Sequence, residues 1–332
     1  MELSELLQQM QGIMVEQQQP QSQPTIHLII LVSALLLDLL FGEYPAMLHP
    51  TVFIGRVISL FKARLKHRSK IREYTNGFIF AVTLVASVYL LAYNILSILE
   101  VHDIALIIVS VFLLKSTFAI RAMEEHADAV MNSLRLNDIA SARSNLSMIV
   151  GRDTSRLDEE HILSATIESI GESTVDGITS PLFYYALLGV PGALAYRAIN
   201  TLDSMIGYRD EYHMHIGYTS AKLDTIANYI PARLTALTMI LAAMLLRLDW
   251  RNALRIMLRD RHNTQSKNSG YPISVMAGSL RIRLEKIGYY TLGDRESVIT
   301  IEHCRMALRV MKLSSLIFIV IVVLPLLMIR IV

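Results

Sequence analysis

Cysteine and charged residues are both scarce in this sequence. The 332 residues include a single cysteine, Cys304, and only 18% of them are charged, compared with about 25% in soluble domains. One cysteine excludes an internal disulfide framework and a thiolate metal cage. The net charge is +2, from 31 basic and 29 acidic residues, so no nucleic-acid partner is expected.

Hydrophobic residues are abundant instead, at 53% of the chain with a mean hydropathy of +0.42. This composition favours a polytopic membrane protein. A helix that spans a bilayer needs about 20 apolar residues, and four stretches approach or reach that length: 26–41, 78–99, 104–120 and 314–329. Two more stretches, 181–198 and 229–246, are interrupted by glycine, proline or arginine and predict short spans, re-entrant segments or buried helices.

Lysine and arginine are distributed unevenly among the loops. The turn between the second and third predicted spans has none, whereas the segment between the first two has seven: Arg56, Lys62, Arg64, Lys66, Arg68, Lys70 and Arg72. Because cytoplasmic loops are enriched in these residues, we predict a multi-pass protein of the cytoplasmic membrane with its N-terminus outside. Residues 121–180 and 247–312 are then cytoplasmic. The two interrupted stretches both cross or both fail to cross, which gives six spans or four.

The segments between the spans have helical periodicity, and no alternating strand pattern is found. The predicted fold class is therefore all-α, a polytopic membrane protein with cytoplasmic helical segments. The predicted domains are a disordered glutamine-rich tail at 1–24, three transmembrane helices within 25–120, a cytoplasm-facing catalytic region at 121–312 with embedded or re-entrant helices at 181–198 and 229–246, and a C-terminal transmembrane helix at 313–332.

The densest group of polar residues is GRDTSRLDEEHILSATIESIGESTVDG, at 151–177. Ser155 and Asp158 resemble a capping box, so a helix is predicted to begin at Ser155. Glu168 and Glu172 then share one face near the negative end of the helix dipole, where like charges four residues apart repel. A cation is expected beside them, and Mg²⁺ binds one or two carboxylates together with phosphate oxygens. A solvated polar face is the alternative.

A second group lies in YRAINTLDSMIGY, at 196–208, where Arg197, Asn200 and Asp203 are spaced by three inside an apolar frame. Ionisable residues in an embedded segment are candidates for function. The alternative is an internal ion pair between Arg197 and Asp203. The two interpretations have equal weight from the sequence alone.

Two later segments contain residues that could bind anions. One is NYIPAR at 228–233, preceded by Lys222 and Asp224, and the other is HNTQSKNSGYPISVMAG at 262–278. Successive backbone amides in an Asn-Ser-Gly turn can cradle an anion, although most such turns are only loops. No GxxxxGK[ST] loop occurs, so a nucleotide site here is not a P-loop.

These strings, in this order, resemble the adenosylcobinamide-phosphate synthase family of cobalamin biosynthesis. The strings are GRDTSRLDEEHILSATIESIGESTVDG, YYALLGVPGALAYRAINTLDSMIGY, NYIPARLTA and NSGYPISVMAG. The resemblance covers roughly residues 36–312 and includes 38–55. Two departures stand out. Ser173 occupies a position where the family usually has asparagine, and Glu43-Tyr44-Pro45 replaces the usual Asp-Pro after Gly42.

The resemblance implies an integral membrane ligase that uses ATP and Mg²⁺. Its substrates would be adenosylcobyric acid and (R)-1-aminopropan-2-ol or the O-phosphate of that amine, and its other partner is the lipid bilayer. The oligomeric state stays open, a homo-oligomer included. The alternatives are a non-catalytic membrane sensor of the same superfamily, a magnesium-dependent membrane diphosphate transferase, and a transporter.

On this interpretation each candidate side chain is given a predicted role. The metal ligands are Glu168, Glu172 and Asp176; the phosphate contacts are Arg152, Arg197, Lys222 and Arg233; the hydrogen-bonding groups for the corrin amides are Asn200, Asn228 and Asn268; and the catalytic residues are Glu168 with either Asp153 or Asp203 as the base. The sequence does not decide between the two aspartates.

Overall fold

The computed structural model describes residues 22–329. Most of the predicted tail at 1–24 therefore lies outside the described residues, and its last three residues belong to the first helix. The helices are α2 (Ser22–Phe41), α3 (Pro50–Lys62), η1 (Ala63–Leu65), α4 (Lys70–Leu99), α5 (Asp103–Lys115), α6 (Ile120–Arg135), α7 (Ile139–Ser147), α8 (Glu159–Thr174), η2 (Val175–Thr179), α9 (Ser180–Ile206), α10 (Tyr218–Ala227), α11 (Tyr229–Leu245), α12 (Trp250–Asp260), α13 (Gly270–Leu280), α14 (Ile301–Phe318), η3 (Ile319–Val323) and α15 (Leu324–Ile329).

The predicted all-α fold class is confirmed, with one small exception. Two three-residue strands, β1 (Leu284–Lys286) and β2 (Tyr290–Leu292), pair antiparallel across a turn that contains Gly288 at φ 76°. No strand was predicted because three residues are too few to display a period of two. The hairpin packs on α8.

The polytopic character is also confirmed. In the described part of the chain, four helical stretches are long and apolar enough to cross a membrane: Lys70–Leu99, Asp103–Arg135, Glu159–Ile206 and Ile301–Ile329. The pair formed by α10 and α11, bent by 46°, is a further candidate, and Thr25–Phe41 is a shorter apolar helix. The apolar window of Glu159–Ile206 is 83% buried within the protein, against 17% for α4. Glu159–Ile206 is therefore mostly surrounded by protein, whereas the surface of α4 is mostly free to contact lipid.

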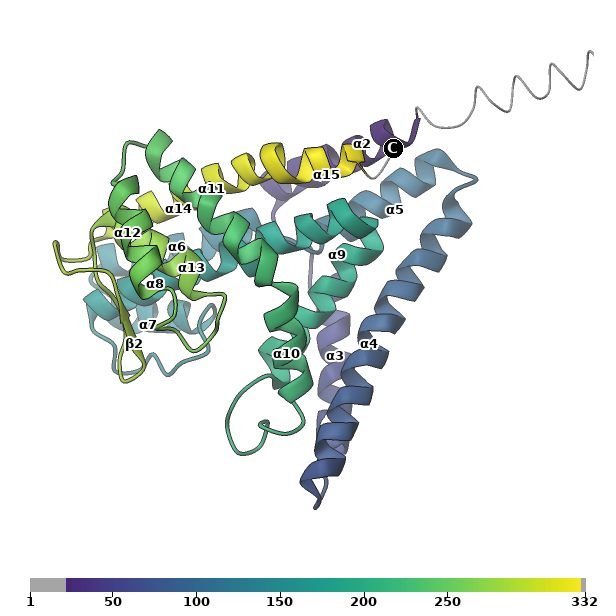
Figure 1. Ribbon diagram of the computed structural model, residues 1–332, viewed down its shortest axis with the longest axis horizontal. Helices are drawn as coiled ribbons and strands as arrows, with labels where there is room; N and C mark the ends of the chain where they lie inside the picture. The colour runs from purple at the N-terminus through teal and green to yellow at the C-terminus, as the bar shows by residue number, and fades with distance from the viewer. Residues whose placement is uncertain (1–21, 330–332) are drawn as a thin grey trace, which may run out of the picture.

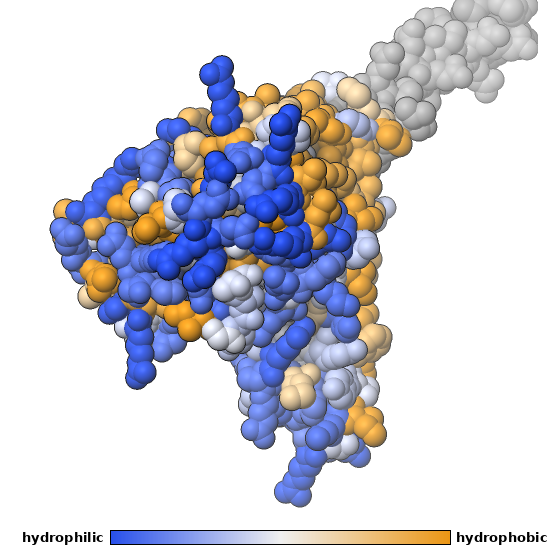
Figure 2. Space-filling view, turned by 60° about the vertical axis from the view of Figure 1, so that its left-hand side comes forward, coloured by the Kyte–Doolittle hydropathy of each residue, from blue (hydrophilic) through white to orange (hydrophobic). Residues whose placement is uncertain are grey.

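The two sides of the molecule contain different elements. Figure 1 shows α6, α7, α8, α12, α13 and the hairpin on the left, and the start of α2, the α4–α5 connection and the end of α15 together on the right. We call the left-hand group of helices with the hairpin the helical domain. In Figure 2 its face is mostly hydrophilic, and hydrophobic residues gather on the right-hand side of the molecule. One large apolar core joins the helical domain to the elements on the right in Figure 1.

A smaller apolar core positions the functional region. Ile54 and Ile58 of α3 pack with Ala81 of α4, Leu202 of α9 and Ile216 of the following loop. Gly77 of α4 allows that loop to approach, because a Cβ there would lie 2.1 Å from the Ile216 carbonyl oxygen. The end of α9 and the start of α10 are thus fixed against α3 and α4.

Helix α9 is broken where the sequence predicted an interrupted apolar stretch. Gly189 has φ 71° and ψ −167°, and Pro191 follows it. This backbone conformation is open almost only to glycine. We expect Gly189→Ala to lower the free energy of unfolding by about 1–3 kcal/mol, measured by unfolding of the purified protein in detergent. Gly55→Ala within α3 is the matched control, because its Cβ meets only the Met205 sulfur at 3.4 Å; equal losses in both variants would contradict the argument.

Candidate active site

A cavity of 810 Å³ lies among α4, α8, α9, α10 and two loops. Its lining is rich in charged groups of both signs: Tyr74, Glu172, Asp203, Gly207, Tyr208, Arg209, Met214, Gly217, Tyr218, Ala221, Lys222, Asp224, Thr225, Gln265, Ser266 and Lys267. These residues come from four regions that are far apart in the sequence. The cavity includes members of three of the predicted motifs.

Three carboxylates are among the residues that line this cavity. Glu172 stands at the end of α8, Asp203 near the end of α9 and Asp224 in the middle of α10. The charge of Asp224 interacts with those of Asp203 and Glu172, and Asp176 in η2 interacts with all three. Repulsion among close like charges makes such a group a natural place for a cation. Asp224 was noted in the sequence but given no role, because a lone aspartate on a helix has no distinguishing pattern.

Asn228 holds Asp224 in place. Its amide nitrogen donates to Asp224 Oδ1 at 3.0 Å, and its amide oxygen accepts from the hydroxyls of Ser180 at 2.6 Å and Tyr196 at 2.9 Å. Asn228 is only 1% exposed and does not line the cavity. Its side chain thus contacts Asp224, Ser180 and Tyr196 in the structure, and its contact to the corrin stays a prediction.

Basic side chains line the same cavity. Lys222 of α10 was predicted, whereas Arg209 in the loop after α9 and Lys267 in the loop before α13 were not. All three are exposed. Single basic residues in loops, such as Arg209 and Lys267, form no sequence pattern that would identify them as binding residues. The fold places them on the same cavity as Lys222 and the carboxylates. An anion and its counter-cation could therefore be held in one space.

The loop between α9 and α10 fits tightly around Asp203. A Cβ added at Gly207 would lie 2.0 Å from Asp203 Oδ1, and one at Gly217 would lie 1.6 Å from the carbonyl oxygen of Ile206. Atoms cannot approach so closely, so both positions require glycine. The glycines allow the loop to fold back beside the Asp203 carboxylate and to form one wall of the cavity.

Glu168 is placed differently from the prediction. It is 2% exposed, and its Oε2 accepts from Arg152 Nη2 at 2.6 Å and from the Tyr290 hydroxyl at 2.8 Å, while Oε1 accepts from the Ser164 hydroxyl at 3.1 Å. Burial and the adjacent Glu168 charge raise the pKa of Tyr290, which keeps it a hydrogen-bond donor. The cation expected beside this acid is thus Arg152, and both carboxylate oxygens are already engaged.

Helix α8 begins at Glu159 and not at Ser155 as predicted. Asp158 is the N-cap residue, and its side chain accepts from the backbone N–H of His161 at 2.9 Å. Ser155 instead donates its backbone N–H to Asp153 Oδ1 at 2.9 Å. The Asp158 side chain thus caps the helix by accepting the backbone N–H of its third residue, His161.

The three predicted metal ligands do not line one cavity. Glu172 does, but Glu168 and Asp176 are not among the lining residues. In the part of the chain that the structure describes, no group of three or more His, Cys, Asp or Glu side chains is arranged to hold a metal ion. Mg²⁺ does not require such a group, because it commonly takes one or two carboxylates and completes its shell with water and phosphate oxygens. Glu172, Asp203 and Asp224 have the chemistry for that mode.

The two candidate bases are in different surroundings. Asp203 lines the cavity. Asp153 is exposed on the loop before α8 and outside the cavity lining, and the hydrogen bond from the Ser155 backbone lowers the pKa of Asp153. The geometry therefore favours Asp203 over Asp153.

Arg197 and Asn200 pair with each other. Arg197 Nη1 donates to Asn200 Oδ1 at 3.1 Å. The alternative ion pair between Arg197 and Asp203 is not among the salt bridges of the described residues. Neither Arg197 nor Asn200 lines the cavity, so their predicted contacts to phosphate and corrin stay predictions.

Arg233 and Asn268 connect the elements behind the cavity. The Arg233 guanidinium lies 3.5 Å from the ring centre of Tyr229 and 4.5 Å from that of Tyr271, and it donates to Asn268 Oδ1 at 3.2 Å. Asn268 in turn donates to the carbonyl oxygen of Thr225 at 2.9 Å. These contacts join the loop that carries Lys267 to α10 and α11, and the predicted contacts of Arg233 to phosphate and of Asn268 to the corrin stay predictions.

Comparison with known proteins agrees with the motif order. Residues 31–314 match the model of the family described as CobD/Cbib protein. The chain belongs to the CobD/Cbib family. Among its relatives is the cobalamin biosynthesis protein CobD of Dehalococcoides mccartyi, 39% identical over 80% of this chain and 87% of that protein. The probable cobalamin biosynthesis proteins CobD of Methanothermobacter thermautotrophicus (43%; 80% and 86%) and Thermoplasma volcanium (39%; 91% and 98%) are also similar. No solved structure matches the chain.

Membership of the CobD/Cbib family supports a role in cobalamin biosynthesis, and it confirms the resemblance inferred from the motifs.

The family match includes residues 38–55, where the structure contains a buried charge cluster. Lys115 of α5 is fully buried, with its Nζ 3.3 Å from Asp38 Oδ1 and 3.1 Å from Glu43 Oε1. Glu43 Oε2 lies 2.7 Å from His49 Nε2. Burial alone would raise the pKa of Glu43, but His49 and Lys115 together lower it.

Proposed function

We propose that this CobD/Cbib protein is an ATP-dependent ligase. It joins the free carboxylate of adenosylcobyric acid to the amine of (R)-1-aminopropan-2-ol or its O-phosphate, giving adenosylcobinamide or its phosphate. Family membership supports the pathway. The observation that supports the reaction class is that Glu172, Asp203 and Asp224 line the same cavity as Arg209, Lys222 and Lys267, because phosphoryl transfer needs both metal-binding and phosphate-binding groups.

The chemistry requires activation of the acid. A carboxylate and an ammonium ion form an unreactive salt at neutral pH. Transfer of the ATP γ-phosphoryl group to a carboxylate oxygen forms a P–O bond, releases ADP and gives an acyl phosphate. The amine nitrogen, after losing a proton to a base, attacks the acyl carbon. The C–N bond forms as the C–O bond to phosphate breaks, and phosphate leaves with that electron pair.

The cavity residues can be given roles in this sequence of steps. Lys222, Arg209 and Lys267 would contact phosphate oxygens. Glu172 and Asp224 would hold Mg²⁺, which when bound neutralises charge on the transferring phosphoryl group. Asp203 would take the proton from the amine. Asn228 keeps Asp224 in position, and the Arg152–Glu168 pair fixes the hairpin above α8.

We also propose that the cavity faces the cytoplasm and that the N-terminus is outside. The ends of α2, α4 and α15 that are predicted to be external lie together on the side away from the helical domain (Figure 1). This arrangement supports the proposal that all three ends lie on the same side of the membrane. ATP is available only on the cytoplasmic side, which agrees with the positive-inside distribution of the loops.

Amide formation by the purified full-length protein in lipid nanodiscs tests the ligase proposal. With adenosylcobyric acid and the amino alcohol or its phosphate, product is expected only when ATP and Mg²⁺ are both present, with one ADP released per amide. Chelation of Mg²⁺ should abolish turnover. Lys222→Gln should raise the KM for ATP about tenfold or more, whereas Arg251→Gln, an exposed arginine of α12 outside the cavity, should not.

Two results would refute the proposal. Amide formation at an unchanged rate without ATP would exclude ATP-dependent activation. Binding of adenosylcobyric acid without any turnover, in protein shown to be folded, would favour the non-catalytic sensor.

A further inference from the structure

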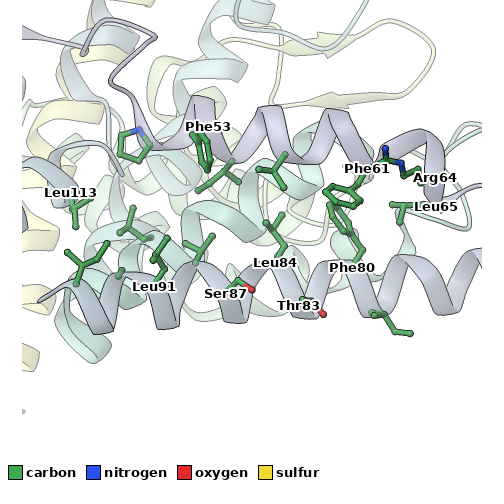
Figure 3. Close-up of a pocket in the computed structure, with 18 of the residues that line it drawn as sticks. Phe53, Phe61, Arg64, Leu65, Phe80, Thr83, Leu84, Ser87, Leu91 and Leu113 are labelled. Carbon is green, nitrogen blue, oxygen red and sulfur yellow. The ribbon is translucent and has the colours of Figure 1, made fainter. Parts of the chain in front are cut away.

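A second cavity, of 890 Å³, lies between α3 and α4 and shares no lining residue with the cavity described above. Figure 3 shows side chains of the two helices pointing toward one another across it, among them Phe53 and Phe61 from α3 and Leu84 and Leu91 from α4. Leu113 of α5 closes one end. We call this cavity the α3–α4 groove.

The α3–α4 groove is apolar along its length and polar at one end. The apolar part is lined by Ile54, Val57, Ile79, Val88 and Ile95 among others, with only the small hydroxyls of Thr83 and Ser87 between them. Arg64 and Asn76 mark the other end. The Phe61 and Phe80 rings are 5.7 Å apart, and the Arg64 guanidinium lies 5.2 Å from the Phe61 ring centre. A ligand that fits must therefore be long, apolar and charged at one end.

The polar end opens on a strongly basic tip. Residues 62–72, which form this tip, contain six lysines and arginines and no acid. Lys66 pairs with Glu73 and Lys62 donates to the Met205 carbonyl oxygen. Arg64, Arg68, Lys70 and Arg72 are exposed. The same tip forms the hydrophilic lower end of the molecule in Figure 2. Its charge selects an anion.

We propose that the α3–α4 groove binds an anionic phospholipid. One acyl chain lies along the groove, and the phosphate headgroup contacts Arg64 and neighbouring basic residues of the tip. Asn76 and Ile95 are about 28 Å apart along α4, and an acyl chain covers half of a hydrocarbon core of about 30 Å, so the groove is long enough. Basic clusters just cytoplasmic of a transmembrane helix recognise anionic headgroups.

A lipid fits the groove better than the other candidates. The groove has no acid and, apart from Arg64 and Asn76, no strong hydrogen-bonding group, so the many amides of a corrin would lose water without gaining partners there. A second copy of the chain would bring its own basic tip to the same place, and the two tips would repel. Of the four candidate spans in the described residues, α4 has the least buried apolar window, which leaves the groove open to the bilayer.

Lipid titration of the delipidated full-length protein, followed by native mass spectrometry, tests this proposal. Phosphatidylglycerol and phosphatidylcholine with identical acyl chains are compared. We expect phosphatidylglycerol to bind at least fivefold more tightly, and Arg64→Gln to weaken only phosphatidylglycerol, by about fivefold, as estimated for one basic residue near an anionic surface. Ser87→Trp should fill the groove and weaken both lipids.

Matched controls make the test specific. Ala86 is exposed on α4 beside Ser87 but does not line the groove, so Ala86→Trp should leave both lipids unaffected, as should Arg251→Gln. Equal binding of the two lipids by the unmodified protein would overturn the proposal. So would equal effects of Ser87→Trp and Ala86→Trp, displacement of phosphatidylglycerol by free glycerol 3-phosphate, or a Ser87→Trp variant that dissociates a dimer while keeping its lipid.

Discussion

Asp203→Asn is expected to lower kcat for amide formation about 10²- to 10⁴-fold, the usual effect of removing a general base. Asp203 lines the cavity, and asparagine has the same shape but cannot accept the proton of the amine. Asp153→Asn should change kcat by less than about twofold, as for other exposed positions. Steady-state rates of both purified variants at saturating ATP and Mg²⁺ measure the difference.

The pair of variants also resolves the choice that the sequence left open. If Asp153→Asn lost as much activity as Asp203→Asn, or if Asp203→Asn stayed near normal, Asp203 would not be the base. Thermal unfolding of each variant in detergent separates a catalytic loss from a folding defect. The KM for ATP should change little in Asp203→Asn, since the phosphates are held by Lys222 and the other basic residues.

Lys115→Met should lower the free energy of unfolding by about 3–5 kcal/mol, the cost of leaving a buried charge without its partner. Lys115 is fully buried between Asp38 and Glu43, and the Tyr44 ring centre is 5.1 Å from its Nζ. Asp38 Oδ2 also accepts the backbone N–H groups of Ile120 and Arg121, both at 3.1 Å. The cluster therefore joins α2 and α5 to the first turn of α6.

Unfolding by sodium dodecyl sulfate from mild detergent measures this loss. Lys312→Met is the control, because Lys312 and its partner Glu124 are 43% and 34% exposed and such pairs contribute about 0–1 kcal/mol. The double variant Asp38→Asn with Lys115→Met should lose much less than the sum of the single losses, since neither charge is then left unpaired. If the losses of unfolding free energy were additive in the double variant, Asp38 and Lys115 would not be coupled. Equal losses for Lys115→Met and Lys312→Met would likewise contradict the prediction.

The fold class could be predicted because its signals are local. Long apolar stretches identified the helices that can cross a membrane, and Gly189 and Pro191 correctly marked 181–198 as interrupted. The hairpin at 284–292 was missed because its strands are three residues long. The start of α8 was misplaced because Ser155 and Asp158 are both good capping residues, and only the backbone geometry shows which one caps the helix.

The candidate site was predicted less completely. Glu172, Asp203 and Lys222 were identified and lie on one cavity. Glu168 was grouped with Glu172 because the two share a helix face, yet Tyr290, 122 residues later, donates to it together with Arg152. Asp224, Arg209 and Lys267 were given no role. The residues that make these contacts are not regularly spaced in the sequence, because they lie on separate segments that only the fold brings together.

The sequence by itself determined that the chain is helical, polytopic and a member of its family, because apolar run length, helical spacing and the order of motifs are properties of neighbouring residues. The tertiary structure alone decided which acids share a space with which bases. Which acids and bases share a cavity depends on how α8, α9 and α10 pack. Packing sets the distances between side chains on different helices, and the order of residues along the chain does not determine those distances. Glu168 became the partner of Arg152, and Asp224 became part of the cavity, for this reason.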